Sequence, residues 1–242
     1  MTDRHADENG WLSSSQAWLD RMPEKGDFAR EFVLDKPMVE RALLHKPANV
    51  LDVGCGDGRF CRALKKHGLA TTGIDPVKPF VDFAASKDAE GCYKVGFADN
   101  LPFTDETFDL AVFYLTLIDI EQMEQAVEEA VRVLKPGGKI LVANLSSFHT
   151  SNGTIGWVKG EDGNSYWPLG SYHKECCDWF AWDGIRIRNW HRPLSTYMAA
   201  FLNNGMTLSH FDEPLPVGCT QEQIDKYMKN PFLMMMEWRK LG

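Results

Sequence analysis

The sequence predicts an α/β fold with a doubly wound, mostly parallel, seven-stranded sheet, and three observations support this prediction. Short apolar runs typical of buried strands alternate with amphipathic stretches of helical length. A glycine-rich turn follows the first run, at Gly54, Gly56 and Gly58. A long segment without a clear period, 145–192, interrupts the alternation. Strands that alternate with helices are joined by right-handed crossovers, which produce a mostly parallel sheet.

The expected strands are short apolar runs bounded by turn residues. Asn49–Val53 is apolar, and Phe108–Leu117 is a continuous apolar run, as expected for a strand buried on both faces. Two runs near the end of the chain are typical of closing strands. In chain order, the seven expected strands are Asn49–Val53, Ala70–Ile74, Tyr93–Phe97, Phe108–Leu117, Lys139–Asn144, Thr207–Phe211 and Phe232–Trp238.

Most of the expected helices have an apolar face and a recognisable end. Ser13 and Gln16 have the spacing of a capping box, and they precede a short amphipathic stretch. Pro37 suits the first turn of a helix, and Gly68 and Gly205 suit the position just after a last turn. The helices expected after the one near Ser13 are Pro37–Lys46, Arg59–His67, Val77–Ser86, Glu121–Leu134 and Leu194–Asn203.

Composition narrows the classes of function. The 242 residues, 44% of them hydrophobic, suit one domain spanning 1–242. The net charge of -8 repels phosphate backbones and no run of Lys and Arg occurs, so we expect no nucleic-acid partner. The N-terminus has no apolar signal core, and no apolar run approaches the roughly 18 residues of a membrane span. We therefore expect a cytoplasmic monomer or homodimer without a membrane partner.

The six cysteines and seven histidines indicate neither a disulfide framework nor a metal centre. No Cys-x-x-Cys pair occurs, and Cys176 and Cys177 are adjacent, which disfavours a bridge between them. We expect reduced thiols and no bound metal.

The turn after Asn49–Val53 is the strongest candidate for a binding site. Glycines permit positive φ and close approach of a ligand, and the N-terminus of the next helix favours an anionic group. A dinucleotide fingerprint needs its third glycine at position 59, where this chain has Arg59. Asp52, inside the turn, suits an ammonium group better than a phosphate. Asp75, at the end of the second strand, accepts hydrogen bonds from ribose hydroxyls in either cofactor class.

Five segments, in order and at the usual spacing, resemble the motifs of class I methyltransferases that use S-adenosylmethionine. The resemblance covers about residues 45–145 and is strongest to the branch with the ubiquinone/menaquinone methyltransferases and many small-molecule enzymes. It implies a Rossmann-like methyltransferase fold with an aromatic-rich insertion after the fifth strand. The segments are Val50–Gly58, Gly73–Pro76, Ala98–Phe103, Phe108–Val112 and Arg132–Lys139.

The resemblance also implies which residues hold the cofactor. Asp52 lies near the methionine amino group, Asp75 binds the ribose hydroxyls, and Asp99 bonds the adenine amino group. Tyr114 and Leu115 line the methyl-donor side. The full set of implied cofactor contacts is Asp52, Gly54, Cys55, Gly56, Asp75, Pro76, Asp99, Asn100, Leu101, Tyr114 and Leu115.

Two further segments are expected to complete the site. An N-terminal helical lid, 1–47, closes over the cofactor, with Arg30 placed to reach the methionine carboxylate or simply to lie in solvent. The segment 145–192 is expected to bind substrate, because ligands in such sheets lie beyond the carboxyl ends of the strands. Within or beside it, His191 and His149 are candidate general bases, with hydrogen-bonded structural roles as the alternative.

The expected activity is methyl transfer from S-adenosylmethionine to an oxygen, nitrogen or carbon atom of a small-molecule metabolite. Positioning two reactants and excluding water carry most of such a reaction, so no fixed catalytic residue is required. Two alternatives stay open: an NAD-dependent oxidoreductase, and a module that binds the cofactor without transferring its methyl group.

Overall fold

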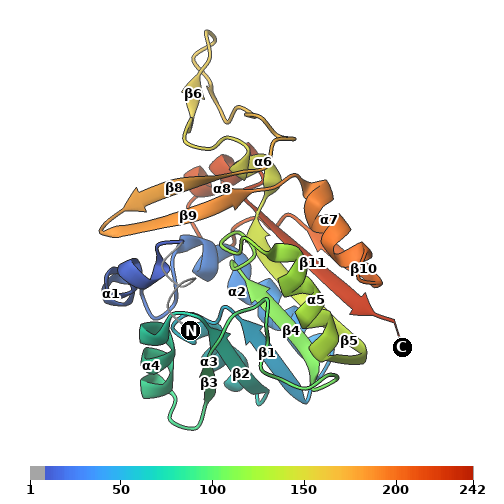
Figure 1. Cartoon of the computed structure of the whole chain (residues 1–242). Helices are drawn as coiled ribbons and strands as arrows, with labels where there is room; N and C mark the ends of the chain where they lie inside the picture. Colours follow the sequence, from blue (N-terminus) through green and yellow to red (C-terminus); the bar gives the residue numbers. More distant parts are fainter. Residues whose placement is uncertain (1–8, 242) are drawn as a thin grey trace.

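The structure, a computed structural model, describes residues 9–241 and contains a seven-stranded sheet of order β10-β11-β5-β4-β1-β2-β3 (Figure 1). The pairs among β1 to β5 are parallel, and β11 is antiparallel to both β5 and β10. The mostly parallel, doubly wound prediction is confirmed. The strands are β1 (Asn49–Val53), β2 (Ala70–Asp75), β3 (Cys92–Val95), β4 (Phe108–Tyr114), β5 (Leu134–Leu145), β10 (Met206–Asp212) and β11 (Leu233–Lys240).

Helices cover both faces of this sheet. The core on one face packs α5 and α7 against the strands, and Phe201 stacks on Trp238 with 4.8 Å between ring centroids. The core on the other face contains Leu34 of η1, Met38 of α2 and Phe60 of α3. The helices are α1 (Trp11–Arg21), the π-helix η1 (Arg30–Leu34), α2 (Asp35–Leu44), α3 (Arg59–Lys65), α4 (Lys78–Lys87), α5 (Met123–Val133), α6 (Ser147–Thr150), α7 (Leu194–Leu202) and α8 (Gln221–Met228).

The differences from the predicted elements include the start of α1, the end of β4 and the presence of α8. Helix α1 begins at Trp11 after a left-handed Gly10, and the Ser13 hydroxyl donates to the Gly10 carbonyl, so the predicted capping box is wrong. Strand β4 ends at Tyr114 because Leu115 has a φ of 57°, which turns the chain out of the sheet. Helix α8 was not predicted at all. Its sequence is largely polar, and no residue of it is buried.

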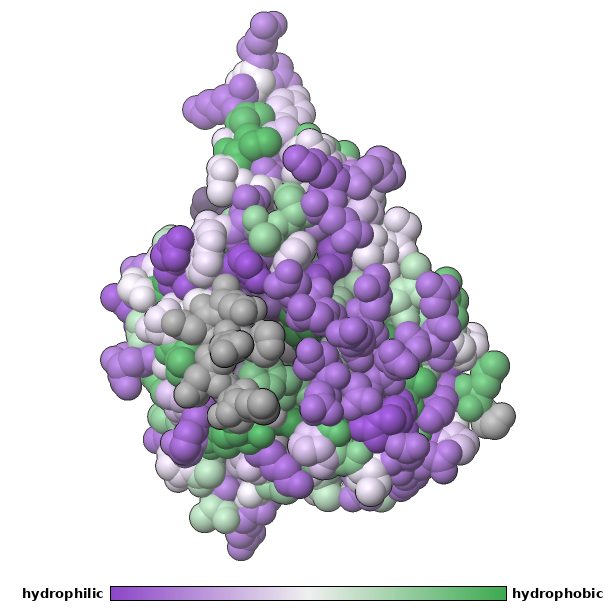
Figure 2. Space-filling view, viewed as in Figure 1, coloured by the Kyte–Doolittle hydropathy of each residue, from purple (hydrophilic) through white to green (hydrophobic). Residues whose placement is uncertain are grey.

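The segment 145–192 is more regular than its sequence indicated. Strands β8 (Cys176–Trp182) and β9 (Ile185–His191) form an antiparallel hairpin that lies across one end of the molecule above α1 (Figure 1). Much of β8 is exposed, so no alternation of apolar and polar residues marked it. Strands β6 (Val158–Lys159) and β7 (Ser165–Tyr166) form a small arm that projects beyond the hairpin in Figures 1 and 2.

The β8–β9 hairpin is bonded to the N-terminal segment. The Ser14 hydroxyl donates to the Arg186 carbonyl at 3.0 Å and accepts from the Arg186 N–H at 2.9 Å. The Arg188 N–H donates to the Asn9 carbonyl at 2.9 Å, and the Trp190 N–H donates to the Ile118 carbonyl at 2.7 Å. Together α1 and the hairpin form a cover over one end of the sheet. Residues 1–8 of the expected lid lie outside the described residues.

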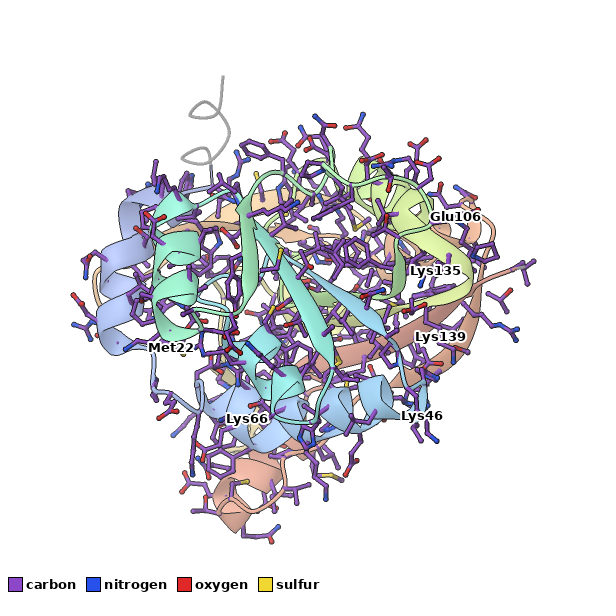
Figure 3. All side chains as sticks on the ribbon, turned by 90° about the horizontal axis from the view of Figure 1, so that it is seen from below. Met22, Lys46, Lys66, Glu106, Lys135 and Lys139 are labelled. Atoms are coloured by element: carbon purple, nitrogen blue, oxygen red, sulfur yellow. The ribbon has the colours of Figure 1, made fainter. Side chains whose placement is uncertain are left out.

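The cover lies over the carboxyl ends of the parallel strands. In the view from below, Glu106, Lys135 and Lys139 lie together near the starts of β4 and β5 (Figure 3). Met22, which follows α1, lies on the other side of that view (Figure 3). A ligand site under the cover therefore has the usual position for an open α/β sheet. No helix within residues 9–241 is long and apolar enough to cross a membrane.

Candidate functional site

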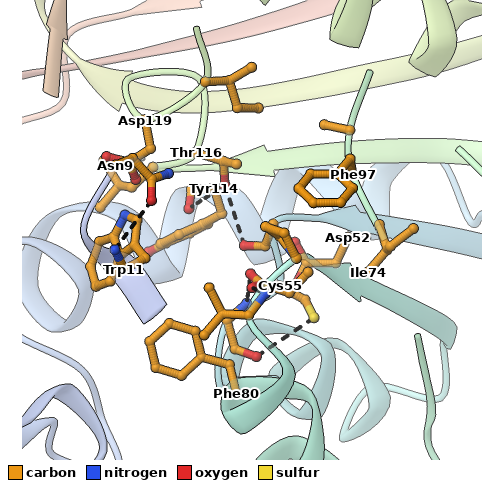
Figure 4. Close-up of a pocket in the computed structure, with 18 of the residues that line it drawn as sticks. Asn9, Trp11, Asp52, Cys55, Ile74, Phe80, Phe97, Tyr114, Thr116 and Asp119 are labelled. Atoms are coloured by element: carbon orange, nitrogen blue, oxygen red, sulfur yellow. Dashed lines mark hydrogen bonds between the residues drawn. The ribbon is translucent and has the colours of Figure 1, made fainter. Parts of the chain in front are cut away.

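A cavity of about 180 Å³ lies between the carboxyl ends of β1, β2 and β4 and the cover formed by α1 and β9. Ten of the twelve predicted cofactor contacts, Arg30 among them, line this cavity, and several appear in Figure 4. The ten are Arg30, Asp52, Gly54, Cys55, Gly56, Asp75, Pro76, Asp99, Tyr114 and Leu115.

The glycine-rich turn leaves room for a ligand in one place and for a neighbouring side chain in another. Gly54, Gly56 and Gly58 have φ values of 73°, 52° and 75°. A Cβ on Gly54 would lie 2.2 Å from Cγ2 of Thr116, so the loop after β4 packs directly on this glycine. A Cβ on Gly56 would meet no heavy atom of the described residues within 4 Å. The backbone at Gly56 is therefore open for close approach of a bound group.

Asp75 holds the turn and faces the cavity. One carboxylate oxygen accepts from the Gly56 N–H and the other from the Val77 N–H, each at 2.9 Å. Burial raises the pKa of Asp75 to about 6, against the opposing effect of these two N–H donors. Each oxygen keeps acceptor capacity, as bonding to a ribose requires.

Asp52 has a buried oxygen without a protein partner. Its Oδ2 accepts from the Cys61 thiol at 3.3 Å, whereas Oδ1 has no hydrogen-bond partner within residues 9–241. Burial raises the pKa of Asp52 to about 7, with a contribution from the nearby Asp75. An unpaired buried carboxylate oxygen is costly, and a cationic group in the cavity would remove that cost. Asp52 therefore fits an ammonium group of a ligand.

Arg30 supplies positive charge to the same cavity. Its guanidinium bonds the Asp27 carboxylate at 2.6 Å and lies over the rings of Trp18 and Tyr114, 5.2 and 5.9 Å from their centroids. Only 15% of its side chain is exposed, so it is not the solvated surface charge considered as the alternative. Arg59, at the position of the missing third glycine, pairs instead with Asp35.

The Arg59 pair is part of the scaffold under the cavity. The guanidinium donates to both Asp35 oxygens, at 2.6 and 2.9 Å, and the Tyr114 hydroxyl donates to Asp35 at 2.7 Å. Phe60 stacks on the Tyr114 ring with 4.7 Å between centroids. These contacts fix the Tyr114 ring where it lines the cavity.

Only one of the three residues predicted to contact adenine lines the cavity within the described chain. Asp99 lines the cavity with Phe97 and Ala98. Asn100 and Leu101 are not among the described lining residues. Leu101 is buried in the α5–α7 core, and its N–H donates to the Glu129 carboxylate at 2.7 Å. The cofactor contacts of Asn100 and Leu101 therefore stay predictions from the resemblance, since neither residue lines the cavity within the described chain.

The two candidate bases lie outside the cavity wall, among the described residues. The Nδ1 of His191 lies 2.8 Å from the Thr150 hydroxyl, and its Nε2 lies 2.8 Å from the Tyr172 carbonyl. With both ring nitrogens bonded, His191 ties α6 to the chain before β8. His149 stacks on Trp167, with 4.7 Å between centroids, and burial lowers its pKa to about 4. The geometry thus favours the structural alternative for both histidines.

Sequence reasoning missed several cavity residues. Arg188 comes from β9, whereas Trp11 and Trp18 of α1 belong to the expected lid and do line the cavity. Asp119 follows β4 and lines the cavity beside Asn9 and Trp11 (Figure 4). The sequence did carry a signal for Asp119: it lies in the loop directly after a predicted strand, and such loops line the site in an open α/β sheet. Within residues 9–241, no group of three or more His, Cys, Asp or Glu side chains has the arrangement of a metal site.

Comparisons with known proteins agree on one kind of domain. Residues 51–142 match a family described as a methyltransferase domain. The chain is 30% identical over 164 residues to the malonyl-[acyl-carrier protein] O-methyltransferase of Erwinia pyrifoliae, covering 60% of this chain and 63% of that protein. It is 32% identical to the demethylmenaquinone methyltransferase of Thermotoga maritima, covering 52% of this chain and 59% of that protein. The chain thus spans less than two thirds of these curated relatives.

A solved structure shows the same fold over most of the chain. It is an S-adenosylmethionine-dependent methyltransferase from Mesorhizobium loti, with a TM-score of 0.76 and 22% sequence identity. The similarity covers 90% of this chain and 100% of that one. It therefore extends well beyond residues 51–142.

Proposed function

We propose that the chain is a class I S-adenosylmethionine-dependent methyltransferase, which transfers a methyl group to an oxygen, nitrogen or carbon atom of a small molecule. The observation that carries the proposal is the unpaired Oδ1 of Asp52 in the cavity wall. S-Adenosylmethionine has an ammonium group that matches this oxygen. The pyrophosphate of a dinucleotide is negatively charged and would be repelled by the Asp52 carboxylate, which disfavours the NAD-dependent alternative.

The remaining lining residues suit the other parts of this cofactor. Asp75 is placed to accept hydrogen bonds from the ribose, and Arg30 to bind the methionine carboxylate. Asp99, with Phe97 and Ala98, is placed at the adenine end, and Tyr114 lines the wall nearest the methyl donor. When bound, the cofactor supplies an electrophilic methyl group on a sulfonium.

We propose distinct roles for the two covering segments. Helix α1, with Trp11 and Trp18, excludes water from the cavity, and hairpin β8–β9 brings Arg188 to the acceptor end. Within the described chain, Arg188 is the one residue of the segment 145–192 that lines the cavity. We therefore propose that the aromatic side chains of this segment pack within the cover and do not contact substrate. All six cysteines are free, which supports a cytoplasmic location.

Binding of S-adenosylhomocysteine, the expected product, tests the cofactor assignment by calorimetry. Wild-type protein should bind it and should not bind NAD. Asp52→Asn should weaken binding by about 30-fold, which corresponds to about 2 kcal/mol for a charged hydrogen bond that is lost. Asp82→Asn is a matched control, because Asp82 is exposed on α4 and pairs only with Lys78 among the described residues.

Transfer of label from S-adenosylmethionine to a metabolite extract tests the activity itself. A labelled small molecule supports the proposal. If the product cofactor binds and no labelled compound forms, the protein is a cofactor-binding module and not an enzyme. If NAD binds in place of S-adenosylhomocysteine, the cofactor assignment itself is wrong.

A further inference from the structure

Asp119 is a cavity carboxylate that the proposed cofactor contacts do not use. Its backbone N–H donates to the Thr116 carbonyl at 2.9 Å, which closes a turn directly after β4. The turn directs its side chain into the cavity, near Asn9 and Trp11 and across from Asp52 (Figure 4).

Two donors from the cover hold this carboxylate. The Asn189 amide of β9 donates to Oδ1 at 2.6 Å, and the Trp11 side chain of α1 also donates a hydrogen bond. An amide and an indole are neutral donors, so they orient the carboxylate without neutralising it. Arg188, which also lines the cavity, already pairs with Glu121 at 3.0 Å.

We propose that Asp119 accepts a proton from the methyl acceptor, and that the acceptor is therefore a small molecule whose nucleophilic oxygen or nitrogen carries a hydrogen. This inference rests on the proposed function and narrows it, because it excludes carbon nucleophiles, thioethers and tertiary amines. The carboxylate lies where α1, β9 and the loop after β4 meet, which is the end of the cavity left for an acceptor once the cofactor contacts are assigned.

The step balances without a further reactant. A lone pair on the acceptor oxygen or nitrogen forms the new bond to the methyl carbon, and the carbon–sulfur bond breaks with its electron pair moving to sulfur. The hydrogen on the acceptor atom leaves as a proton and is taken up by an oxygen of Asp119. A positioned base of this kind contributes about 10²–10⁴-fold to rate.

The surroundings of Asp119 keep it able to exchange a proton near neutral pH. Burial raises its pKa to about 7, and the donors Trp11 and Asn189 oppose that rise. Arg30 of η1 also lowers this pKa, whereas Asp75 of β2 raises it. A base is most effective when its pKa lies near the working pH, so this balance suits proton transfer.

Paired acceptors test the inference directly. Labelled S-adenosylmethionine is incubated with phenols and their methyl ethers, and with secondary amines and their tertiary counterparts. We expect label only on members that carry the hydrogen. Asp119→Asn should lower kcat by about 100-fold or more while its affinity for S-adenosylhomocysteine stays within about threefold of wild type. Asp82→Asn, an exposed carboxylate on α4, should behave as wild type in both measurements.

A readout independent of turnover uses carbon-13 NMR of aspartate-labelled protein loaded with S-adenosylhomocysteine. The carboxyl resonance that is absent from Asp119→Asn belongs to Asp119 and should titrate near pH 7. In Asn189→Ala it should titrate higher, because a donor to the charged form is lost.

Several outcomes would overturn the inference. They are a titration near the ordinary value of about 4, wild-type turnover by Asp119→Asn, label on the members without the hydrogen, and no label on any member of the panel. Absence of S-adenosylhomocysteine binding to wild-type protein would instead refute the proposed function itself, and this inference with it.

Discussion

At the scale of single residues, the cavity is defined by carboxylates in different environments. Asp52 has an oxygen with no described partner, whereas both oxygens of Asp75 accept backbone N–H groups. Burial raises the pKa of both, to about 7 and about 6. With Asp52 as the proposed partner of the ammonium group, cofactor binding is expected to release a proton, because that group binds the ionised carboxylate.

Affinity for S-adenosylhomocysteine should consequently depend on pH between 8 and 6. Below the Asp52 pKa of about 7, a proton has to leave before the ammonium binds, so affinity should fall as pH falls, by up to about tenfold per unit. Calorimetry in two buffers with different ionisation enthalpies measures both the affinity and the released proton. In Asp52→Asn most of this dependence should disappear. A wild-type affinity that is constant from pH 8 to 6 would contradict the assignment.

At the scale of elements, the glycine turn between β1 and α3 combines two separate requirements. Gly54 is confined by the loop after β4, since an added Cβ would lie 2.2 Å from Thr116. A Cβ on Gly56 would meet no described heavy atom within 4 Å, and this residue borders the cavity. The first glycine is therefore needed for folding and the second for ligand approach.

A pair of alanine variants separates these requirements. Gly54→Ala should lower the free energy of unfolding by about 3 kcal/mol, because left-handed backbone strain adds to overpacking against Thr116. Gly56→Ala should cost only about 1 kcal/mol from backbone strain, yet it should abolish measurable S-adenosylhomocysteine binding. Denaturant unfolding and calorimetry measure the two effects. Equal stability of the two variants would show that the Thr116 contact does not constrain the turn.

At the scale of the whole molecule, two segments that are far apart in the sequence cover the site. Helix α1 and hairpin β8–β9 are joined through Ser14 and Arg186, and a backbone bond links Arg188 to Asn9. Neither segment belongs to the central sheet. The cover is therefore able to loosen without loss of the core, as a lid requires.

Ser14→Ala should loosen this cover. It removes both hydrogen bonds to Arg186, each worth about 1 kcal/mol, so S-adenosylhomocysteine should dissociate about three- to tenfold faster. Stopped-flow tryptophan fluorescence follows the release, because Trp11 and Trp18 line the cavity. Ser13→Ala is the matched control, since the Ser13 hydroxyl donates to the carbonyl of Gly10, the residue just before α1. Equal dissociation rates in both variants would argue against a lid function.

The sequence predicted the centre of the sheet well because strands such as β1 and β4 are buried on both faces. The observed bounds of β1 equal the predicted ones, and β2 differs by one residue. The β8–β9 hairpin was missed because exposed strands such as β8 lack an apolar pattern. His191 was a candidate base with a structural role as the alternative, and its hydrogen-bond partners, Thr150 and Tyr172, are distant in the sequence. Asp119 was missed because its role depends on Trp11 and Asn189, which only the fold brings near it.

The position of β11 between β5 and β10 imposes an order on folding. In the sheet, β11 pairs with β10 on one side and with β5 on the other. Strand β10 comes before β11 in the chain, and β5 lies about 90 residues earlier than β11. During synthesis, β10 therefore has no partner strand in this sheet until residues 233–240 have emerged. Pairings over such long separations close slowly. The half of the sheet containing β1 to β4 is therefore complete first, and the nascent chain exposes the open edge of β5 until its last strand arrives.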